Sequence, residues 1–220
     1  MKEFQEKWTP LIIEALNETI QMTAISMFFS IIFGLAMGLI LVLTRPNFLF
    51  ENKLVYNILN IIVNILRSIP FIILLFFILP FTKLIVGTVI GVKGVIVPLV
   101  IYTAPFIARQ METALLEVEP GVIEAYQAMG IKRRSIIWHV LLREARPAII
   151  LGLTIATVSL IGATAMAGLV GAGGLGDLAY RYGHIQYEVE VMYATVLILI
   201  VLVQAIQMLG NYFAKKLKKD

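Results

Sequence analysis

The sequence contains no cysteine and only two histidines among its 220 residues. Without cysteine, the chain forms no disulfide, no zinc–thiolate site and no thiol nucleophile. His139 and His184 are far apart in the sequence and lie on opposite predicted faces, so we expect no metal site. The nucleotide-binding pattern G-x-x-x-x-G-K-[ST] is also absent, so the chain does not bind ATP through a P-loop.

Charged residues are scarce as well. They make up 15% of the chain, whereas apolar residues make up 60%, and the mean hydropathy is +0.91. A soluble domain has roughly 45–50% apolar residues. The excess predicts helices that cross a membrane and leaves no room for a sizeable soluble domain beside them.

Long uncharged runs place these membrane spans, because each span needs about 20 mainly apolar residues. The first run follows four acidic residues and is too long for a signal-peptide core, so we expect it to remain uncleaved. The second has Arg67 as its only charge and is interrupted by Pro70, where we expect a kink. The fold class is therefore all-α and polytopic, with about five spans in a single domain (1–220, core about 16–213). The expected spans are 19–44, 54–82, 94–107, 148–170 and 191–213. We expect the third span to extend back through 84–92.

Basic residues are distributed unevenly between the predicted loops. Cytoplasmic segments carry an excess of Lys and Arg. With the C-terminus inside, twelve basic residues lie in inner segments (45, 53, 109, 132–134, 143, 146, 215, 216, 218 and 219) and five in outer ones (2, 7, 83, 93 and 181). The expected orientation is N-terminus outside and C-terminus cytoplasmic, with the terminal lysines near anionic membrane lipid and no nucleic-acid partner.

The segment 109–147 is predicted to be a cytoplasmic loop that contains two short helices. Apolar residues recur at helical spacing after Pro120, and Gly130 suits a helix end, so we expect a helix over Pro120–Met129. A second helix is expected over Arg134–Arg143. A short helix is marginal in water and must pack its apolar side on something. Its own bundle, lipid headgroups and a groove on a partner protein all remain open.

This loop resembles the EAA loop of ABC importer permeases. The matching residues are Glu124-Ala125-Tyr126, Gly130 four residues later, and Val140-Leu141-Leu142. Tyr126 departs from the pattern where it has a second alanine, and Arg143 departs where it has proline. Three further segments resemble the methionine-import ABC permeases: 67–71 (RSIPF), 104–109 (APFIAR) and 171–176 (GAGGLG).

The resemblance implies a transport subunit rather than an enzyme. In such permeases two copies form the pore, two separate ABC ATPase subunits bind ATP and Mg, and an extracytoplasmic substrate-binding (lipo)protein delivers the substrate. The expected cargo is D- or L-methionine or a related amino acid, and the expected location is the bacterial plasma (inner) membrane. Other small amino acids or osmolytes are the alternative. The implied ATPase-coupling residues are Glu124, Ala125, Tyr126, Met129 and Gly130.

Polar residues inside the predicted spans suggest a pathway. Asn57, Asn60, Asn64 and Arg67 share one side of a helix, which we call the polar stripe and expect to point at protein or water. Interhelical bonding is one interpretation of Arg67 and Asn64, and a pathway or gate is the other. Met166, among small residues, is a candidate gate or an ordinary packed side chain.

Glycines in the predicted spans and outer loops suggest close packing or tight turns. Gly34-x-x-x-Gly38 and Gly87-x-x-x-Gly91 predict close helix packing. The 171–176 run formally matches a dinucleotide fingerprint but follows a membrane span instead of a strand, so we expect a tight outer turn.

Two other classes fit the composition less well. An intramembrane enzyme needs paired carboxylates or histidines, and the predicted spans contain no Asp, Glu or His. A secondary transporter leaves the amphipathic cytoplasmic helix unexplained.

Overall fold

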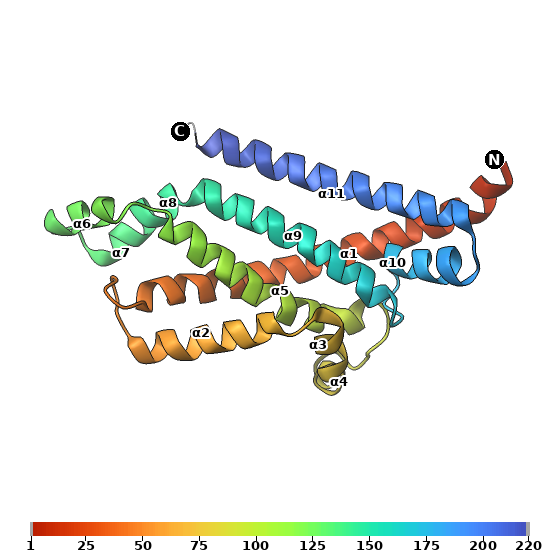
Figure 1. Ribbon diagram of the computed structural model, residues 1–220, viewed down its shortest axis with the longest axis horizontal. Coiled ribbons are helices and arrows are strands. Elements are labelled where there is room, and N and C mark those ends of the chain that lie inside the picture. The colour runs from red at the N-terminus through yellow and green to blue at the C-terminus, as the bar shows by residue number, and fades with distance from the viewer. Residues whose placement is uncertain (1, 219–220) are drawn as a thin grey trace. The chain divides into compact units, whose positions relative to one another are not determined.

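The computed structural model describes the backbone of residues 2–218, and every regular element in this range is helical. Figure 1 shows the course of the chain. The elements are α1 (Lys2–Thr44), α2 (Lys53–Ser68), α3 (Phe71–Phe77), α4 (Leu79–Val86), α5 (Gly91–Leu116), α6 (Pro120–Ala128), α7 (Arg133–Ile136), a π-helical segment (Ile137–Leu141), α8 (Leu142–Glu144), α9 (Arg146–Gly168), α10 (Gly174–Leu178), a second π-helical segment (Ala179–Ile185) and α11 (Val189–Leu217).

Four of the described helices are long and apolar enough to cross a membrane: Glu6–Thr44 within α1, α5, α9 and α11. A fifth span is formed if α2 and α3, which are separated by a short break, are taken together. The all-α class and the expected number of spans are therefore confirmed. In lipid this is the natural outcome, because a helix pairs its own peptide groups.

The kink expected at Pro70 in the second span is confirmed, since α2 and α3 meet there at a bend of 104°. The chain breaks at Ile69–Pro70, because proline has no N–H to donate and the residue before it avoids helical geometry. Pro70 itself is extended, with φ −56° and ψ 139°, and α3 begins after it. The last part of the expected span belongs to a separate short helix, α4.

Two other span boundaries also differ from the sequence prediction. Helix α1 extends back through the acidic residues that precede Thr19. Helix α5 begins at Gly91, so Leu84–Val86 belong to α4, and it continues beyond Ile107 to Leu116. The expectation of spans without acidic residues is therefore wrong, since α5 contains Glu112. Polar side chains do not interrupt a helix, because its hydrogen bonds run along the backbone.

The chain forms two compact units. The first unit contains residues up to Phe29, Ile69–Thr103 and Thr157–Ile206, and the second contains Ser30–Ser68, Ala104–Ala156 and the segment from Gln207. The core of the first unit is formed by buried apolar residues of α1, α3, α5 and α9, among them Met22, Leu75, Leu99 and Leu160. Close packing of these side chains is what holds the helices of this unit together.

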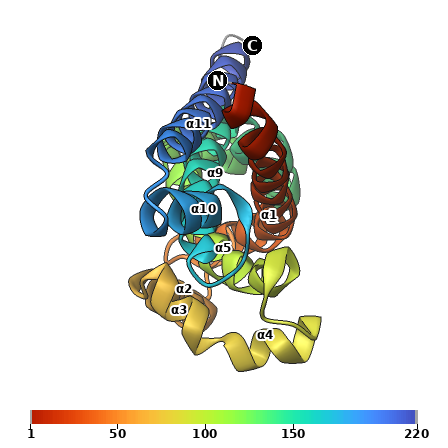
Figure 2. The same cartoon turned by 90° about the vertical axis from the view of Figure 1, so that its right-hand side faces the viewer.

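In the first unit, the glycine-rich turn is fastened to α1, and Figure 2 shows α10 beside that helix. Gly171, Gly173 and Gly174 have φ values between 82° and 84°, which favour glycine. The Glu18 carboxylate accepts a hydrogen bond from the Gly174 N–H (2.6 Å), and the Thr19 hydroxyl accepts one from the Leu175 N–H (2.9 Å). The predicted tight turn is thus confirmed, and it carries the chain from α9 into α10.

The core of the second unit lies where α1 and α5 end. Val42, Met111 and Leu115 pack there with Ile123 of α6 and with Ile136 and Leu141 from the following helical stretch. The helix expected over Pro120–Met129 is confirmed as α6. The second expected helix is confirmed in place, but it consists of α7, the π-helical segment and α8 over 133–144. Wider π-helical turns interrupt α-helices at irregular packing sites.

The two glycine pairs have different structural roles. A Cβ added at Gly34 would lie 2.6 Å from the Ile107 Cβ, and one at Gly38 would lie 2.5 Å from the Met111 Cβ. The predicted close packing is therefore confirmed for this pair, which lets α1 approach α5. It was wrong for Gly87 and Gly91, where an added Cβ would meet nothing within 4 Å and the φ values are 78° and 72°. These two glycines allow the turns between α4 and α5.

This difference gives a stability test in detergent. Gly38→Ala forces a methyl group against the Met111 side chain and the Ala108 carbonyl, so it should destabilise the purified protein by about 1–3 kcal/mol. Gly162→Ala is the matched control, because a Cβ added at Gly162 in α9 would meet nothing within 4 Å. The control should gain about 0.5–1 kcal/mol from helix propensity. Thermal unfolding followed by circular dichroism measures both, and an unchanged midpoint for Gly38→Ala would contradict close packing.

Candidate functional site

Helix α6 presents two different sides. Ile123 is buried in the core of the second unit, and Val122 and Tyr126 pack partly against the same core. The remaining side chains form what we call the outward face, and all are exposed: Glu124, Ala125, Gln127, Ala128 and Met129. The sequence analysis left open what the helix packs on, and the structure shows that one side packs on its own unit.

The end of α6 is set by glycine. Gly130 has φ 73°, and its N–H donates to the Gln127 carbonyl (2.9 Å), while the Ile131 N–H donates to the Tyr126 carbonyl (3.2 Å). These bonds satisfy carbonyls that the helix end would otherwise leave free. At the other end, Pro120 occupies the first turn, where its missing N–H is not needed. The two residues therefore fix the length of the outward face, whose last residue, Met129, is 64% exposed.

Helix α2 carries the polar stripe. Asn57, Asn64 and Arg67 are exposed and Asn60 is half-buried. Among residues 2–218, the Arg67 side chain makes no hydrogen bond or ion pair. The interhelical interpretation is thus confirmed for Asn60 and Asn64, which bond to α5, but Arg67 takes no part in it.

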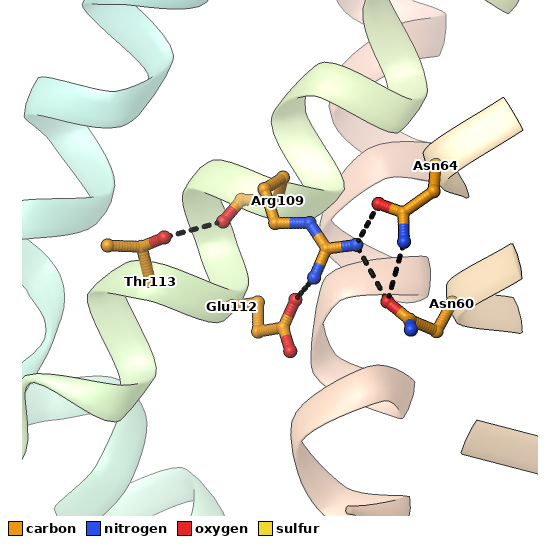
Figure 3. Close-up of polar contacts among 5 residues, drawn as sticks. All are labelled: Asn60, Asn64, Arg109, Glu112 and Thr113. Atoms are coloured by element: carbon orange, nitrogen blue, oxygen red, sulfur yellow. Dashed lines mark hydrogen bonds and ion pairs between the residues drawn. The ribbon is translucent and has the colours of Figure 1, made fainter. Parts of the chain in front are cut away.

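Arg109 of α5 joins the polar stripe to a buried acid, as Figure 3 shows. Its Nη2 donates to the Oδ1 atoms of Asn60 (2.8 Å) and Asn64 (2.7 Å). Its Nη1 donates to Glu112 Oε2, one turn further along α5. The Asn64 amide also donates to Asn60 Oδ1 (3.4 Å). We call these four residues the Arg109 cluster.

Burial makes the pairing in the Arg109 cluster important. The Glu112 side chain is only 5% exposed and that of Arg109 is 24% exposed. A hydrogen bond to a charged group contributes about 1.5–3 kcal/mol, and removing one partner of a buried pair costs about 3–5 kcal/mol. The ion pair neutralises both charges, so the cluster is tolerated among apolar helices.

Sequence analysis missed this cluster. It assigned Arg109 and Glu112 to a polar cytoplasmic loop, whereas both lie on α5. Their i, i+3 spacing directly after an apolar run was a usable signal, because such a pair can neutralise itself on a helix. The partners on α2 could not be found this way, because they are 45 and 49 residues distant in the sequence.

The first unit contains a cavity of about 280 Å³ between α1 and the glycine-rich turn. Its charged lining residues are Glu14, Glu18, Asp177 and Arg181. Asp177 accepts two hydrogen bonds from Arg181 (3.2 and 2.5 Å), and this bonding raises the pKa of the Arg181 guanidinium above its ordinary value. The cavity therefore contains one neutralised pair and two further carboxylates, of which Glu18 holds the turn.

The remaining candidates belong neither to the Arg109 cluster nor to the lining of the cavity. Met166 is half exposed on α9, in the first unit. His139 and His184 are both exposed, in different π-helical segments. Among the residues that the structure describes, no three histidine or acidic side chains come together in a way that would hold a metal ion.

Most of the chain matches a known protein family. Residues 30–219 match the family described as binding-protein-dependent transport system inner membrane component. The chain is 47% identical over 206 residues to the probable D-methionine transport system permease protein MetI of Vibrio cholerae, covering 94% of this chain and 92% of the relative. It is 43% identical over 180 residues to the methionine import system permease protein MetP of Bacillus subtilis, covering 82% and 81%.

Solved structures agree with these relatives. A structure of an inward-facing conformation of the MetNI methionine ABC transporter has a TM-score of 0.93 and 45% identity, covering 96% of this chain and 98% of the other. The crystal structure of an amino acid ABC transporter with histidines has a TM-score of 0.80 at 19% identity, a likeness of fold alone. The chain thus belongs to the binding-protein-dependent transport system inner membrane components, and it is the multi-pass permease subunit of an ABC transporter.

Proposed function

We propose that this chain imports methionine across the bacterial inner membrane as the permease of an ABC importer. The support is similarity to methionine permeases over most of the chain, at 43–47% identity, with a closely similar fold. On this proposal residues 1–220 act as one permease domain, in spite of the two structural units. An ABC permease for another small amino acid or an osmolyte is the competing hypothesis.

The proposed assembly follows the importer pattern. Two copies of the chain would form the pathway, and two ATPase subunits would bind ATP and Mg²⁺, for which this chain has no P-loop. An extracytoplasmic binding protein would deliver the substrate. Alternating access would then be driven by a contact between each permease and its ATPase.

The outward face of α6 is the proposed contact with the ATPase. The observation that carries this proposal is that α6 is anchored by Ile123 while Met129 and Glu124 on its other side are exposed. Ala125 is small and would allow close approach, and Glu124 would make a polar contact. Tyr126 would act differently, because it would hold α6 on the core of its own unit. Gly130 would act by ending the helix.

Reversing the charge on this face tests the contact. Glu124→Lys should lower both methionine uptake and the amount of ATPase subunit that co-purifies, by about thirtyfold, because a key contact at a desolvated interface costs about 2 kcal/mol or more. Glu190→Lys is the matched control: Glu190 is also exposed, lies in the first turn of α11 and belongs to the other unit. Unimpaired co-purification of the Glu124→Lys variant would exclude this face as the contact.

Asn64, Arg67 and Met166 are the proposed pathway residues. Asn64 and Arg67 are exposed on the polar stripe of α2, and an unpaired guanidinium in lipid costs at least about 2.5–3.5 kcal/mol. A water-filled pathway removes that cost. Met166 is proposed independently, from its half-exposed position on α9.

In the proposed orientation the N-terminus lies outside the cell, and α6 lies in the cytoplasm with the outward face exposed there. This orientation is testable because the chain has no native cysteine. Single cysteines replace Arg134 and Glu190, which are both exposed. A membrane-impermeant maleimide should label Glu190→Cys in intact spheroplasts and Arg134→Cys only after lysis. The opposite pattern would invert the topology.

Substrate identity is tested by uptake. The complex, reconstituted in liposomes with its ATPase and binding protein, should accumulate labelled L- or D-methionine in an ATP-dependent way. Unlabelled methionine should compete, and other amino acids should compete far less. Strong preference for another amino acid would reject methionine as the cargo but leave the permease assignment intact.

A further inference from the structure

Helix α2 has little apolar attachment to its own unit. Val63 is its one buried residue, packed with Leu41 of α1 and Ala108 of α5. Tyr56 and Leu59 support this contact from partly buried positions. The large apolar residues on the opposite side are exposed: Leu54, Ile58, Ile61, Ile62 and Ile65. Since apolar packing is limited, polar contacts decide where α2 lies relative to α5.

The Arg109 cluster supplies those contacts. The amino group of Arg109 that faces α2 donates to the Oδ1 atoms of Asn60 and Asn64, and these two residues are one helical turn apart (Figure 3). Bonding two positions one turn apart restricts sliding and rotation of α2 against α5, which a single bond does not. Val63, between them in the sequence, lies in the same contact.

Glu112 directs the guanidinium. It binds the other amino group of Arg109 from the same helix, so the planar fork is held at one end while its other end reaches α2. The Nε atom of Arg109 is buried without a partner among the described residues. The orientation of this side chain is therefore set by Glu112 on α5 and by the two asparagines on α2.

Helix α5 connects this cluster to α6. Arg109 is two residues before Met111, and Met111 and Leu115 pack in the same core as Ile123 of α6. Only the short segment between Leu116 and Pro120 separates the two helices. A displacement of α6 is therefore delivered to the end of α5 through close packing, and interiors packed in this way transmit displacement instead of absorbing it.

We infer that Arg109 is a positioning residue through which α2, with Asn64 and Arg67, follows the movement of α5 and α6. This inference rests on the proposed function, since it gives the route from the ATPase contact to the proposed pathway. A purely static anchor is the alternative: the cluster would then stabilise the fold without affecting how much substrate moves per ATP.

The experiment measures methionine uptake per ATP hydrolysed in the complete reconstituted transporter. Asn60→Leu keeps the branched shape of the side chain but removes the acceptor, and Arg109→Lys keeps the charge but loses the fork. Both variants should hydrolyse ATP yet move at least about threefold less substrate per ATP. Each one removes either the acceptor or the guanidinium donor of the hydrogen bond between Arg109 and α2. Asn60→Asp retains the Oδ1 acceptor, so its methionine uptake per ATP hydrolysed should stay near that of the native chain.

Asn57→Leu is the matched control. It makes the same substitution one turn earlier on the polar stripe, at an exposed residue outside the cluster, and should leave the ratio unchanged. If Asn60→Leu transports as efficiently per ATP as the native chain, or if Asn60→Asp fails as badly as Asn60→Leu, the inference is overturned. If the native complex transports no methionine at all, the proposed function fails instead, and the two failures are thereby distinguished.

Discussion

Peptide groups find no hydrogen-bond partner in the hydrocarbon of a bilayer, and most of this structure follows from that constraint. Long helices satisfy their own N–H and C=O groups, so α1, α5, α9 and α11 run without interruption over 23 to 43 residues. Where proline removes a donor, at Pro70, the chain breaks and restarts as α3. The two π-helical segments, Ile137–Leu141 and Ala179–Ile185, lie outside these long helices.

Side-chain polarity must be managed under the same constraint. The hydroxyl groups of Thr19, Thr154 and Thr195 donate to carbonyls in the preceding turn of their own helix. A buried charge also needs an oppositely charged partner. Within the described spans, Glu112 is the one buried acid that pairs with a cation, Arg109, which in turn bonds to two asparagines of the neighbouring helix α2. Such pairing removes the net charge and, at the same time, specifies which residues of α2 face α5.

Small residues allow neighbouring helices to pack closely. Gly34 and Gly38 let α1 approach α5, and Gly210 of α11 faces Thr154 of α9, where an added Cβ would lie 2.0 Å from the hydroxyl. Without a hydrophobic driving force between helices in lipid, such close contacts supply much of the attraction. The second unit thereby combines tight packing of α1 on α5 with an α2 that has one buried apolar residue and is joined to α5 by the Arg109 cluster.

The sequence by itself determined the helical class, the number of spans and the limits of α6, because hydropathy, Pro120 and Gly130 act locally. It also predicted the glycine-rich turn. It predicted the kink at Pro70, where the second span is broken. It failed for Gly87 and Gly91, whose spacing matched a packing motif although their φ values serve turns. Only the tertiary structure decided that α6 packs its apolar side on its own unit and that Arg109 meets Asn60 and Asn64. Those outcomes depend on contacts between residues far apart in the chain, and local pattern contains no information about them.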